Sequence, residues 1–181
     1  MASQNQPDAI ALLKADHRKV EDLFEKFEAT KSTAKKQALA KEICTELIVH
    51  TIIEEEIFYP ACKQEIDEDV LSEAYVEHDG AKVLIAELLG SGPEDEFYDA
   101  KMKVLSEEIK HHVKEEEKRA EGMFAQARAA GLDMDGLGKQ LAARKKELLA
   151  KFKTGGLPTP QTRSFTGHKL AQGAPMGEAR A

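Results

Sequence analysis

Tryptophan is absent from this chain of 181 residues, and proline, cysteine and aromatic residues are scarce. No apolar run approaches the roughly 18 residues that cross a bilayer, and the N-terminal segment MASQNQPDAI has neither the basic nor the apolar region of a secretory signal. Cys44 and Cys62 lie about 27 Å apart if one helix carries both, which is too far for a disulfide. These absences predict a cytoplasmic protein with free thiols and no membrane partner.

The formal net charge of −7 is distributed unevenly along the chain. Residues 139–181 contain nine Lys or Arg and two Glu, a net charge of +7, so that residues 1–138 carry −14. An acidic body argues against binding nucleic acid through that part of the molecule. The basic end offers a surface for an acidic protein partner, although a solvated helix face followed by a loose tail is the simpler interpretation.

The residues that are abundant favour helix. Ala, Glu, Lys and Leu dominate, and 33% of the residues are charged. Apolar residues recur at helical spacing in four long segments, at about residues 8–29, 34–63, 67–89 and 94–130. Because short connections join these amphipathic segments, we predict an all-α fold, an antiparallel up-down-up-down four-helix bundle.

Local signals divide the chain further. Pro60 should kink or stop the second helix, Gly90-Ser91-Gly92-Pro93 forms a turn, and Gly131 ends the fourth helix. An extra turn or bulge is expected in that helix near residues 119–122. The predicted organisation is a bundle at residues 7–131, an additional C-terminal helix at 132–153 and a flexible basic tail at 154–181.

Polar side chains interrupt the apolar stripes of all four helices. In the second helix the stripe continues through His50 and Glu54, four residues apart, and in the fourth it continues through His112 and Glu116. Residues at i and i+4 lie within about 6 Å of each other on one side of a helix. The stripes of the first and third helices each contain one histidine, namely His17 and His78.

A pair of metal ions explains why carboxylates stand on faces that should be buried. An unpartnered buried carboxylate costs several kcal/mol, and these stripes offer few Lys or Arg. A glutamate can bridge two cations while neutral imidazoles fill terminal positions, and such N and O ligands suit iron, manganese or zinc. The predicted ligands are His17, His50, Glu54, His78, His112 and Glu116; in the neighbouring register, His111 and Glu115 are the alternative ligands.

This pattern resembles the hemerythrin-like, or HHE cation-binding, domain of bacterial type. The motifs are ADHRKVEDLFEKF, HTIIEEEIFYP, YVEHDGAKV and HHVKEEE, and the resemblance covers about residues 8–130. It implies a four-helix bundle around a non-haem di-iron centre. In such a centre two carboxylates and an oxo or hydroxo group bridge the two iron ions, and oxygen or nitric oxide binds at an open position.

The chain departs from the oxygen-carrying members of that family at Lys82. Those members have a further histidine at this position, one turn after the ligand of the third helix. The site is therefore one imidazole short. This difference favours a reaction with oxygen, peroxide or nitric oxide over simple reversible oxygen carriage.

Residues beside the predicted ligands are candidates for a second layer around the metal. The acidic residues either accept a hydrogen bond from the N–H of a ligand imidazole, and so orient that ring, or are solvated. Lys82 either reaches the site or extends to solvent. The aromatic residues are expected in the core, and one of them can line the open coordination position of the metal. These candidates are Asp16, Glu55, Glu77, Tyr75, Phe24 and Phe58, whereas Glu56 and Glu117 are interpreted as solvated charges.

Three functions are compatible with such a site. The first is a di-iron protein, rather than a dedicated enzyme, that binds small diatomic ligands or peroxide in sensing, scavenging or iron handling. The second is an enzyme that reduces peroxide, oxygen or nitric oxide at the same centre. The third is a module that the metal holds together and that the basic end joins to a protein partner.

Overall fold

Every regular element of the structure is helical within the part of the chain that it describes, residues 7–165 and residue 167 of a computed structural model. The predicted all-α fold is thus confirmed. The elements are α1 (Ala9–Ala29), α2 (Thr33–Ile53), the π-helical turn η1 (Glu54–Phe58), α3 (Tyr59–Cys62), α4 (Glu68–Leu89), α5 (Tyr98–Glu117), α6 (Met123–Ala129) and α7 (Met134–Gly155).

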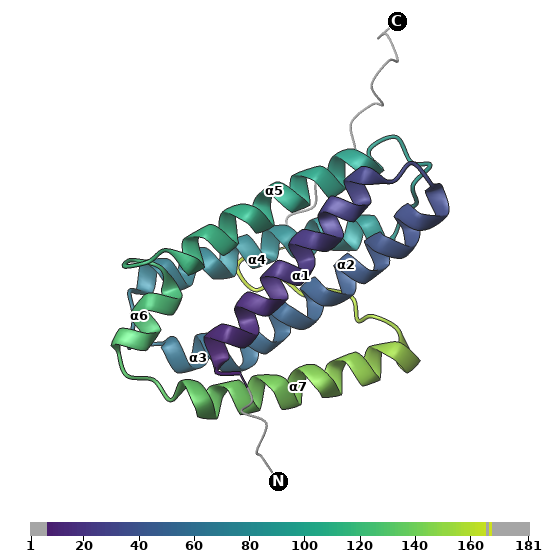
Figure 1. Ribbon diagram of the computed structural model, residues 1–181. Coiled ribbons are helices and arrows are strands. Elements are labelled where there is room, and N and C mark those ends of the chain that lie inside the picture. Colours follow the sequence, from purple (N-terminus) through teal and green to yellow (C-terminus); the bar gives the residue numbers. More distant parts are fainter. Residues whose placement is uncertain (1–6, 166, 168–181) are drawn as a thin grey trace, which may run out of the picture.

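The long helices pack in neighbouring pairs around one apolar core. Figure 1 shows α1 beside α2 and α4 beside α5, and the two members of each pair are in contact. Because only residues 30–32 separate α1 from α2, these two helices run antiparallel. One fully buried side chain from each of the four helices illustrates the shared core: Leu13, Ile43, Ile85 and Leu105.

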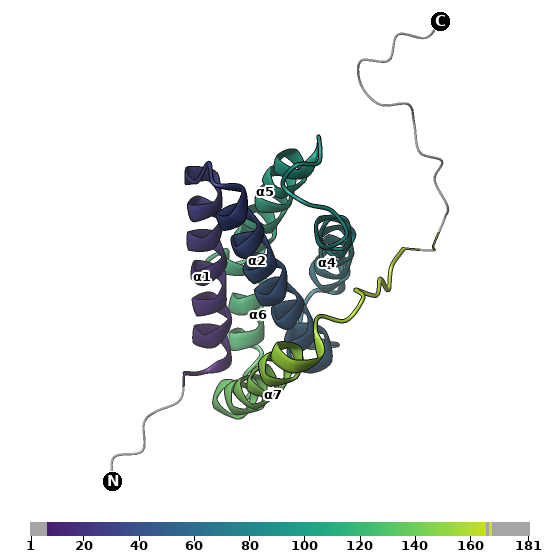
Figure 2. The ribbon, with the colours of Figure 1, turned by 90° about the vertical axis from the view of Figure 1, so that its right-hand side faces the viewer.

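Helix α7 packs against α1, α2 and η1 (Figure 2), and its buried residues, such as Leu141 and Leu148, extend the same core. Its crossing of the start of α1 is close, since a Cβ at Gly138 would lie only 2.6 Å from the Pro7 carbonyl oxygen. Basic residues of α7 pair with acidic residues of the bundle: Arg144 binds Glu56 at 2.7 Å, and Lys145 binds Asp16. Part of the excess positive charge near the C-terminus therefore binds α7 to the acidic bundle.

The predicted second helix, residues 34–63, contains a π-helical turn. The Tyr59 N–H donates to the Glu54 carbonyl oxygen, five residues back rather than four. Pro60 follows directly, and its ring cannot be accommodated against the carbonyl four residues before it in a regular helix. Widening the preceding turn relieves that conflict and allows the helical path to continue through α3.

The single fourth helix predicted at residues 94–130 is wrong, because the chain breaks between α5 and α6. The break spans residues 118–122, where the sequence predicts a local irregularity. A Cβ at Gly122 would lie 2.6 Å from the Glu116 carbonyl oxygen, so the chain folds back onto the end of α5 through a residue without a side chain. The return places Phe124 of α6 in the core.

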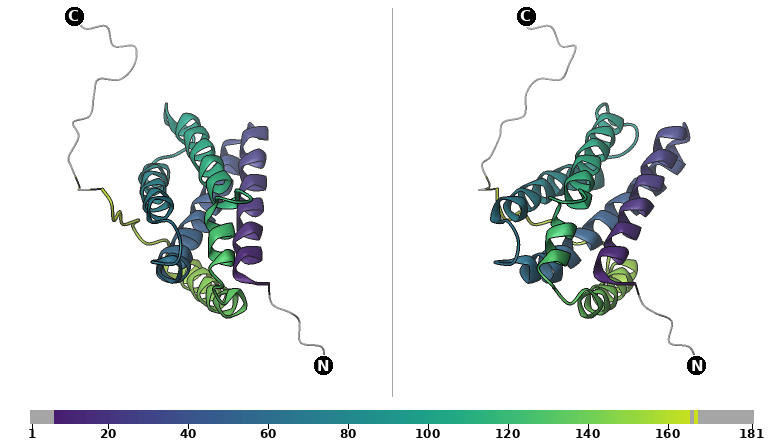
Figure 3. Two further views of the ribbon diagram at one scale, coloured as in Figure 1. Left: turned by 90° about the vertical axis from the view of Figure 1, so that its left-hand side faces the viewer. Right: turned by 60° about the vertical axis from the view of Figure 1, so that its left-hand side comes forward.

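The predicted tail, residues 154–181, begins with a segment that contacts the bundle. After Gly155 ends α7, the chain runs beside α4 (Figures 2 and 3), where Arg163 and Ser164 bind Asp79. Residue 166 and residues 168–181 lie outside the described part of the chain. Among the described helices, none combines the length and the apolar character needed to cross a bilayer.

Candidate metal centre

The six predicted ligands meet in the middle of the bundle. They come from α1, α2, η1, α4 and α5, and none is more than 5% exposed. Two groups form, each with its ligand atoms within 4.8 Å of one another. The first group contains His17, His50, Glu54 and Glu116, and the second contains Glu54, His78 and His112.

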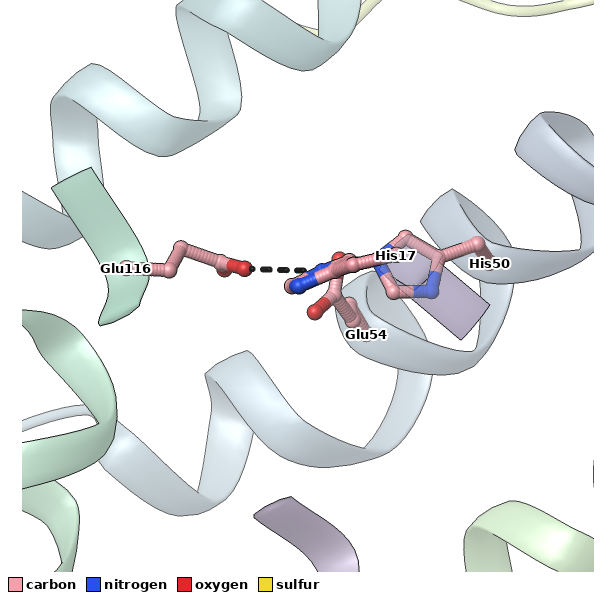
Figure 4. A group of neighbouring side chains, drawn as sticks. All are labelled: His17, His50, Glu54 and Glu116. Carbon is pink, nitrogen blue, oxygen red and sulfur yellow. Dashed lines mark hydrogen bonds and ion pairs between the residues drawn. The ribbon is translucent and has the colours of Figure 1, made fainter. Parts of the chain in front are cut away.

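The first group is drawn in Figure 4. The Nε2 atoms of His17 and His50 are 3.1 Å apart, and Glu54 Oε2 lies 3.1 Å from His50 Nε2. Glu116 reaches in from α5 and places Oε2 3.4 Å from His17 Nε2. Two imidazoles and two carboxylates therefore converge on one small volume, as the ligands of one cation do.

The second group shares its carboxylates with the first. Glu54 Oε2 is 3.3 Å from His78 Nε2, and the Nε2 atoms of His78 and His112 are 3.2 Å apart. Glu116 turns its other oxygen, Oε1, towards His112 Nε2 at 3.5 Å. Both glutamates thus face both groups, the position from which a carboxylate bridges two ions.

Each imidazole has a carboxylate at its outer nitrogen as well. Nδ1 of His17 lies 2.8 Å from Glu117, that of His78 lies 3.1 Å from Glu55, and that of His112 lies 2.7 Å from Glu77. For His50 the facing carboxylate is Asp16, whose Oδ2 forms an ion pair at 3.6 Å, beyond hydrogen-bond distance. Such outer carboxylates fix the tautomer and the orientation of a metal-binding histidine, leaving Nε2 free for the metal.

The four outer carboxylates follow one rule. Each is the immediate chain neighbour of a ligand but serves a histidine of a different helix, as Asp16 beside His17 serves His50. The sequence singles out Asp16, Glu55 and Glu77 for this role. It misses Glu117, which contacts His17 and is not simply solvated.

Burial also shows which of the two neighbouring His and Glu pairs of α5 faces the centre. His112 is buried in the bundle, whereas the side chain of His111 is 58% exposed and lies 3.3 Å from Glu77 at the surface. Glu115 is half-buried and pairs with Lys118 outside the centre. The structure therefore brings His112 and Glu116, and not His111 and Glu115, to the other ligands.

The hydrogen-bonding state of the two shared carboxylates shows that a cation fits between them. Both oxygens of Glu54 and Oε2 of Glu116 are buried without a hydrogen-bond partner. Burial would raise the pKa of Glu54, but the imidazoles of His50 and His78 hold that pKa well below its usual range. A buried carboxylate that stays ionised and lacks hydrogen bonds is matched to a metal ion.

Comparison with protein families agrees with this geometry. The profile of the hemerythrin HHE cation-binding domain matches residues 8–124. The chain belongs to this family. Helix α7 and the segment after it lie beyond the residues that the profile matches.

Two individual proteins are similar to this chain. A solved hemerythrin HHE cation-binding domain-containing protein from Mycobacterium kansasii has 22% sequence identity, a TM-score of 0.67 and coverage of 83% of this chain and 95% of that one. A protein from Nostoc sp. named DNA nickase is 26% identical over 106 residues, which are 59% of this chain. The chain spans only 30% of that relative's length.

The sequence does not reveal that Tyr59 reaches the HHE centre. Its hydroxyl lies 3.1 Å from His78 Nε2 and donates to Glu116 Oε1 at 3.1 Å. In a regular helix the residue five positions after Glu54 points away from it, but a π turn brings residues i and i+5 to one side. Burial, together with Glu116 and Glu54, raises the pKa of Tyr59 well above its usual value, so the phenol keeps its proton in the metal-free protein.

Lys82 takes neither of the two positions predicted for it. The side chain is buried and donates to Glu55 at 2.6 Å and to Asp79 at 3.1 Å. It acts on the centre through Glu55, which holds His78, and not by direct contact. The hydroxyl of Tyr59, and not the side chain of Lys82, contacts His78 Nε2.

Aromatic rings surround the centre on two sides. Phe124 stacks on His17 with the ring centroids 5.9 Å apart and meets Phe58 edge-on at 5.7 Å. On the other side Tyr75 meets Tyr59 edge-on at 5.1 Å. Phe58 and Phe124 are buried, so they exclude water from the His17 half of the centre. Phe24 is a buried core residue, as expected.

A cavity of about 540 Å³ connects the surface with the centre. It reaches His112 and Glu116 and is lined by residues of α4, α5, α6 and the turns beside them. Besides Glu116, its acidic lining residues are Asp67, Glu73, Glu77, Glu115 and Glu121, against one lysine, Lys118. An acidic passage favours entry of cations and neutral molecules over anions.

Without metal, stability should fall as the pH rises. Burial alone would lower the pKa of His50, but Glu54 and Asp16 raise it to about 10. An unfolded histidine has a pKa of about 6.5, so the stability that this proton contributes is complete below pH 6.5 and is lost towards pH 10. We expect the urea midpoint of chelator-treated protein to decrease between pH 6.5 and 7.5, a range below the pKa of about 8.5 of unfolded thiols. A flat or rising midpoint would contradict this, and a His50→Gln variant should reduce the slope.

Proposed function

We propose that this chain binds two iron ions and that the centre reacts with small diatomic ligands or with peroxide, in sensing, scavenging or iron handling. The observation that carries the proposal is the position of Glu54 and Glu116, each of which faces two groups of imidazoles. Four imidazoles, two carboxylates and a phenol, with no thiolate, suit iron better than copper(I), and manganese or zinc are the alternatives.

The residues of the chain prepare the site in three ways. Glu54 and Glu116 would bind from the middle. Three outer carboxylates hydrogen-bond Nδ1 of His17, His78 and His112, and Asp16 faces Nδ1 of His50 at 3.6 Å, so Nε2 of each ring points inwards. Phe58 and Phe124 keep water away from one side, while the acidic cavity opens towards His112. A pair of bound iron ions would supply open coordination positions and one-electron redox chemistry.

Metal analysis tests the proposal directly. Protein purified from iron-replete cells should contain two irons per chain, and the oxidised protein should absorb in the near ultraviolet as coupled ferric pairs do. Purified protein that holds no iron, and takes up none when ferrous iron is added without oxygen, would rule the proposal out. Spectra recorded before and after addition of oxygen, nitric oxide and peroxide then identify the reacting ligand.

The hydroxyl of Tyr59 favours a second candidate function, an enzyme that reduces peroxide, oxygen or nitric oxide. These reductions consume protons, and the hydroxyl donates a hydrogen bond to Glu116 at the centre. It is therefore a group that can hold or pass a proton beside the reacting molecule. Steady turnover that disappears in a His50→Ala variant would distinguish this function from binding alone.

A Tyr59→Phe variant should retain two irons and lose turnover. The expected decrease is roughly 100-fold or more, because a positioned proton donor contributes about that much. Any visible absorption that arises from phenolate bound to ferric iron should vanish as well. Tyr75→Phe is the matched control, since it removes a phenol hydroxyl from a neighbouring ring and keeps the edge-on contact with Tyr59. Equal turnover in the wild-type and Tyr59→Phe proteins would remove Tyr59 from the mechanism.

A further inference from the structure

One buried carboxylate of α4 has no part in holding the metal. Asp79 is inaccessible to solvent, and its Oδ2 accepts hydrogen bonds from the backbone N–H of Arg163 at 2.6 Å, the N–H of Ser164 at 2.5 Å and the Ser164 hydroxyl at 2.7 Å. We call residues 157–165 the strap. The strap is mostly exposed, and Asp79 makes all three of these hydrogen bonds between the strap and α4.

The strap is linked to His78 through two cations. Lys82 bridges Asp79 and Glu55, at 3.1 and 2.6 Å. The Arg163 guanidinium lies 3.6 Å from Glu55 Oε2. Glu55 in turn lies 3.1 Å from His78 Nδ1. Two positive charges therefore hold the carboxylate that orients this imidazole, and one of them belongs to the strap.

A second set of contacts leads from the strap to Tyr59. The Arg163 guanidinium lies over the Tyr75 ring, 5.2 Å from its centroid. Tyr75 meets Tyr59 edge-on, and Tyr59 stacks on His78 with centroids 5.2 Å apart. Both routes end at the half of the centre formed by His78 and His112. The other half has its own supports, Glu117 for His17 and Asp16 for His50.

We propose that the strap is a positioning element for the His78 half of the metal centre. While it is bound to Asp79, Lys82 and Arg163 hold Glu55 against His78. When the strap detaches, Glu55 loses one cation and the His78 ring is less firmly oriented, so the ion at His78 and His112 binds more weakly. The ion at His17 and His50 is not affected. This inference rests on the proposed two-ion function, and the strap lies outside the residues matched by the HHE family.

Two truncated chains test the proposal. A chain that ends after Gly156 lacks the strap, while a control that ends after Gly167 retains it. Both are titrated with Co²⁺, whose visible bands report each binding step without redox chemistry. We expect the control to bind two ions and the shorter chain to bind one equally well and the other roughly 10–100-fold more weakly, the usual effect of losing an outer-shell partner. Identical titrations would overturn the proposal.

Combining the truncation with a substitution in one half of the centre identifies which half the strap affects. In His17→Ala chains only the His78 half is complete, so removal of the strap should weaken binding of the one remaining ion. In His78→Ala chains it should have no effect. If the full chain and the Gly167 control fail to bind two ions of either Fe²⁺ or Co²⁺, the proposed function fails. If they bind two and the truncation changes nothing, only the role of the strap is wrong.

A point substitution repeats the test without shortening the chain. Ser164→Asp places a carboxylate against Asp79, and the repulsion between the two charges should detach the strap from α4. Ser164→Asn is the control, because asparagine has nearly the same size as aspartate and no charge. Ser164 is exposed and lies outside every helix, so the helix content by circular dichroism should be unchanged in both. We expect the selective loss of one ion in Ser164→Asp only. Equal affinities in the two variants would contradict the proposal.

Discussion

Glu54→Gln should empty both halves of the metal centre. Glu54 Oε2 lies 3.1 Å from His50 Nε2 and 3.3 Å from His78 Nε2, and the side chain is completely buried. Glutamine has nearly the same shape but brings no negative charge to bridge two cations. The expected loss of affinity for both ions exceeds the roughly 10–100-fold that follows removal of an outer-shell partner.

Metal content after purification and a titration of the metal-free variant measure this effect. Glu56→Gln is the matched control, because Glu56 belongs to the same π turn but is exposed and pairs with Arg144. That surface pair contributes at most about 1 kcal/mol, so the control should bind two ions. A Glu54→Gln protein that retains either ion at wild-type affinity would show that Glu54 does not bridge.

Removal of metal from the wild-type protein should lower its thermal stability markedly. Two oxygens of Glu54 and one of Glu116 would then be buried without hydrogen-bond partners. An ion present at 1,000 times its dissociation constant stabilises the native state by about 4 kcal/mol. In a protein of this size each kcal/mol changes the melting temperature by about 2–4 °C, so a decrease of about 8–16 °C is expected per ion.

Differential scanning calorimetry with and without chelator measures the change. The Glu54→Gln protein serves as the control, because a protein that binds no metal should melt at the same temperature under both conditions. An unchanged melting temperature of the wild-type protein on complete metal removal would contradict the expectation. It would also exclude the view of this chain as a module that the metal holds together.

The positions of the outer carboxylates explain why both halves of the centre depend on several helices at once. Asp16 of α1 serves His50 of α2, and Glu77 of α4 serves His112 of α5. Lys145 of α7 binds Asp16, while Lys82 and the strap hold Glu55. The segments after residue 124 therefore contact the outer carboxylates of both halves, α7 through Asp16 and the strap through Glu55.

The sequence by itself determined the helical class and most of the helical segments, and it singled out the six side chains that the structure brings together. Helical periodicity is a local property, so a His and a Glu four residues apart on an apolar stripe must share the buried face of their helix. This reasoning predicts His50 with Glu54 and His112 with Glu116, and it prefers His112 to His111. The all-α class follows from the same periodicity.

Only the tertiary structure decided the contacts that depend on irregular turns or on other helices. Tyr59 reaches the centre because Pro60 widens the preceding turn, which a regular helical period does not represent. Glu117 and Lys82 find their partners, His17 and Glu55, on neighbouring helices, and no spacing along one helix encodes such a pair. The break between α5 and α6 and the docking of the strap on Asp79 likewise depend on how distant segments pack.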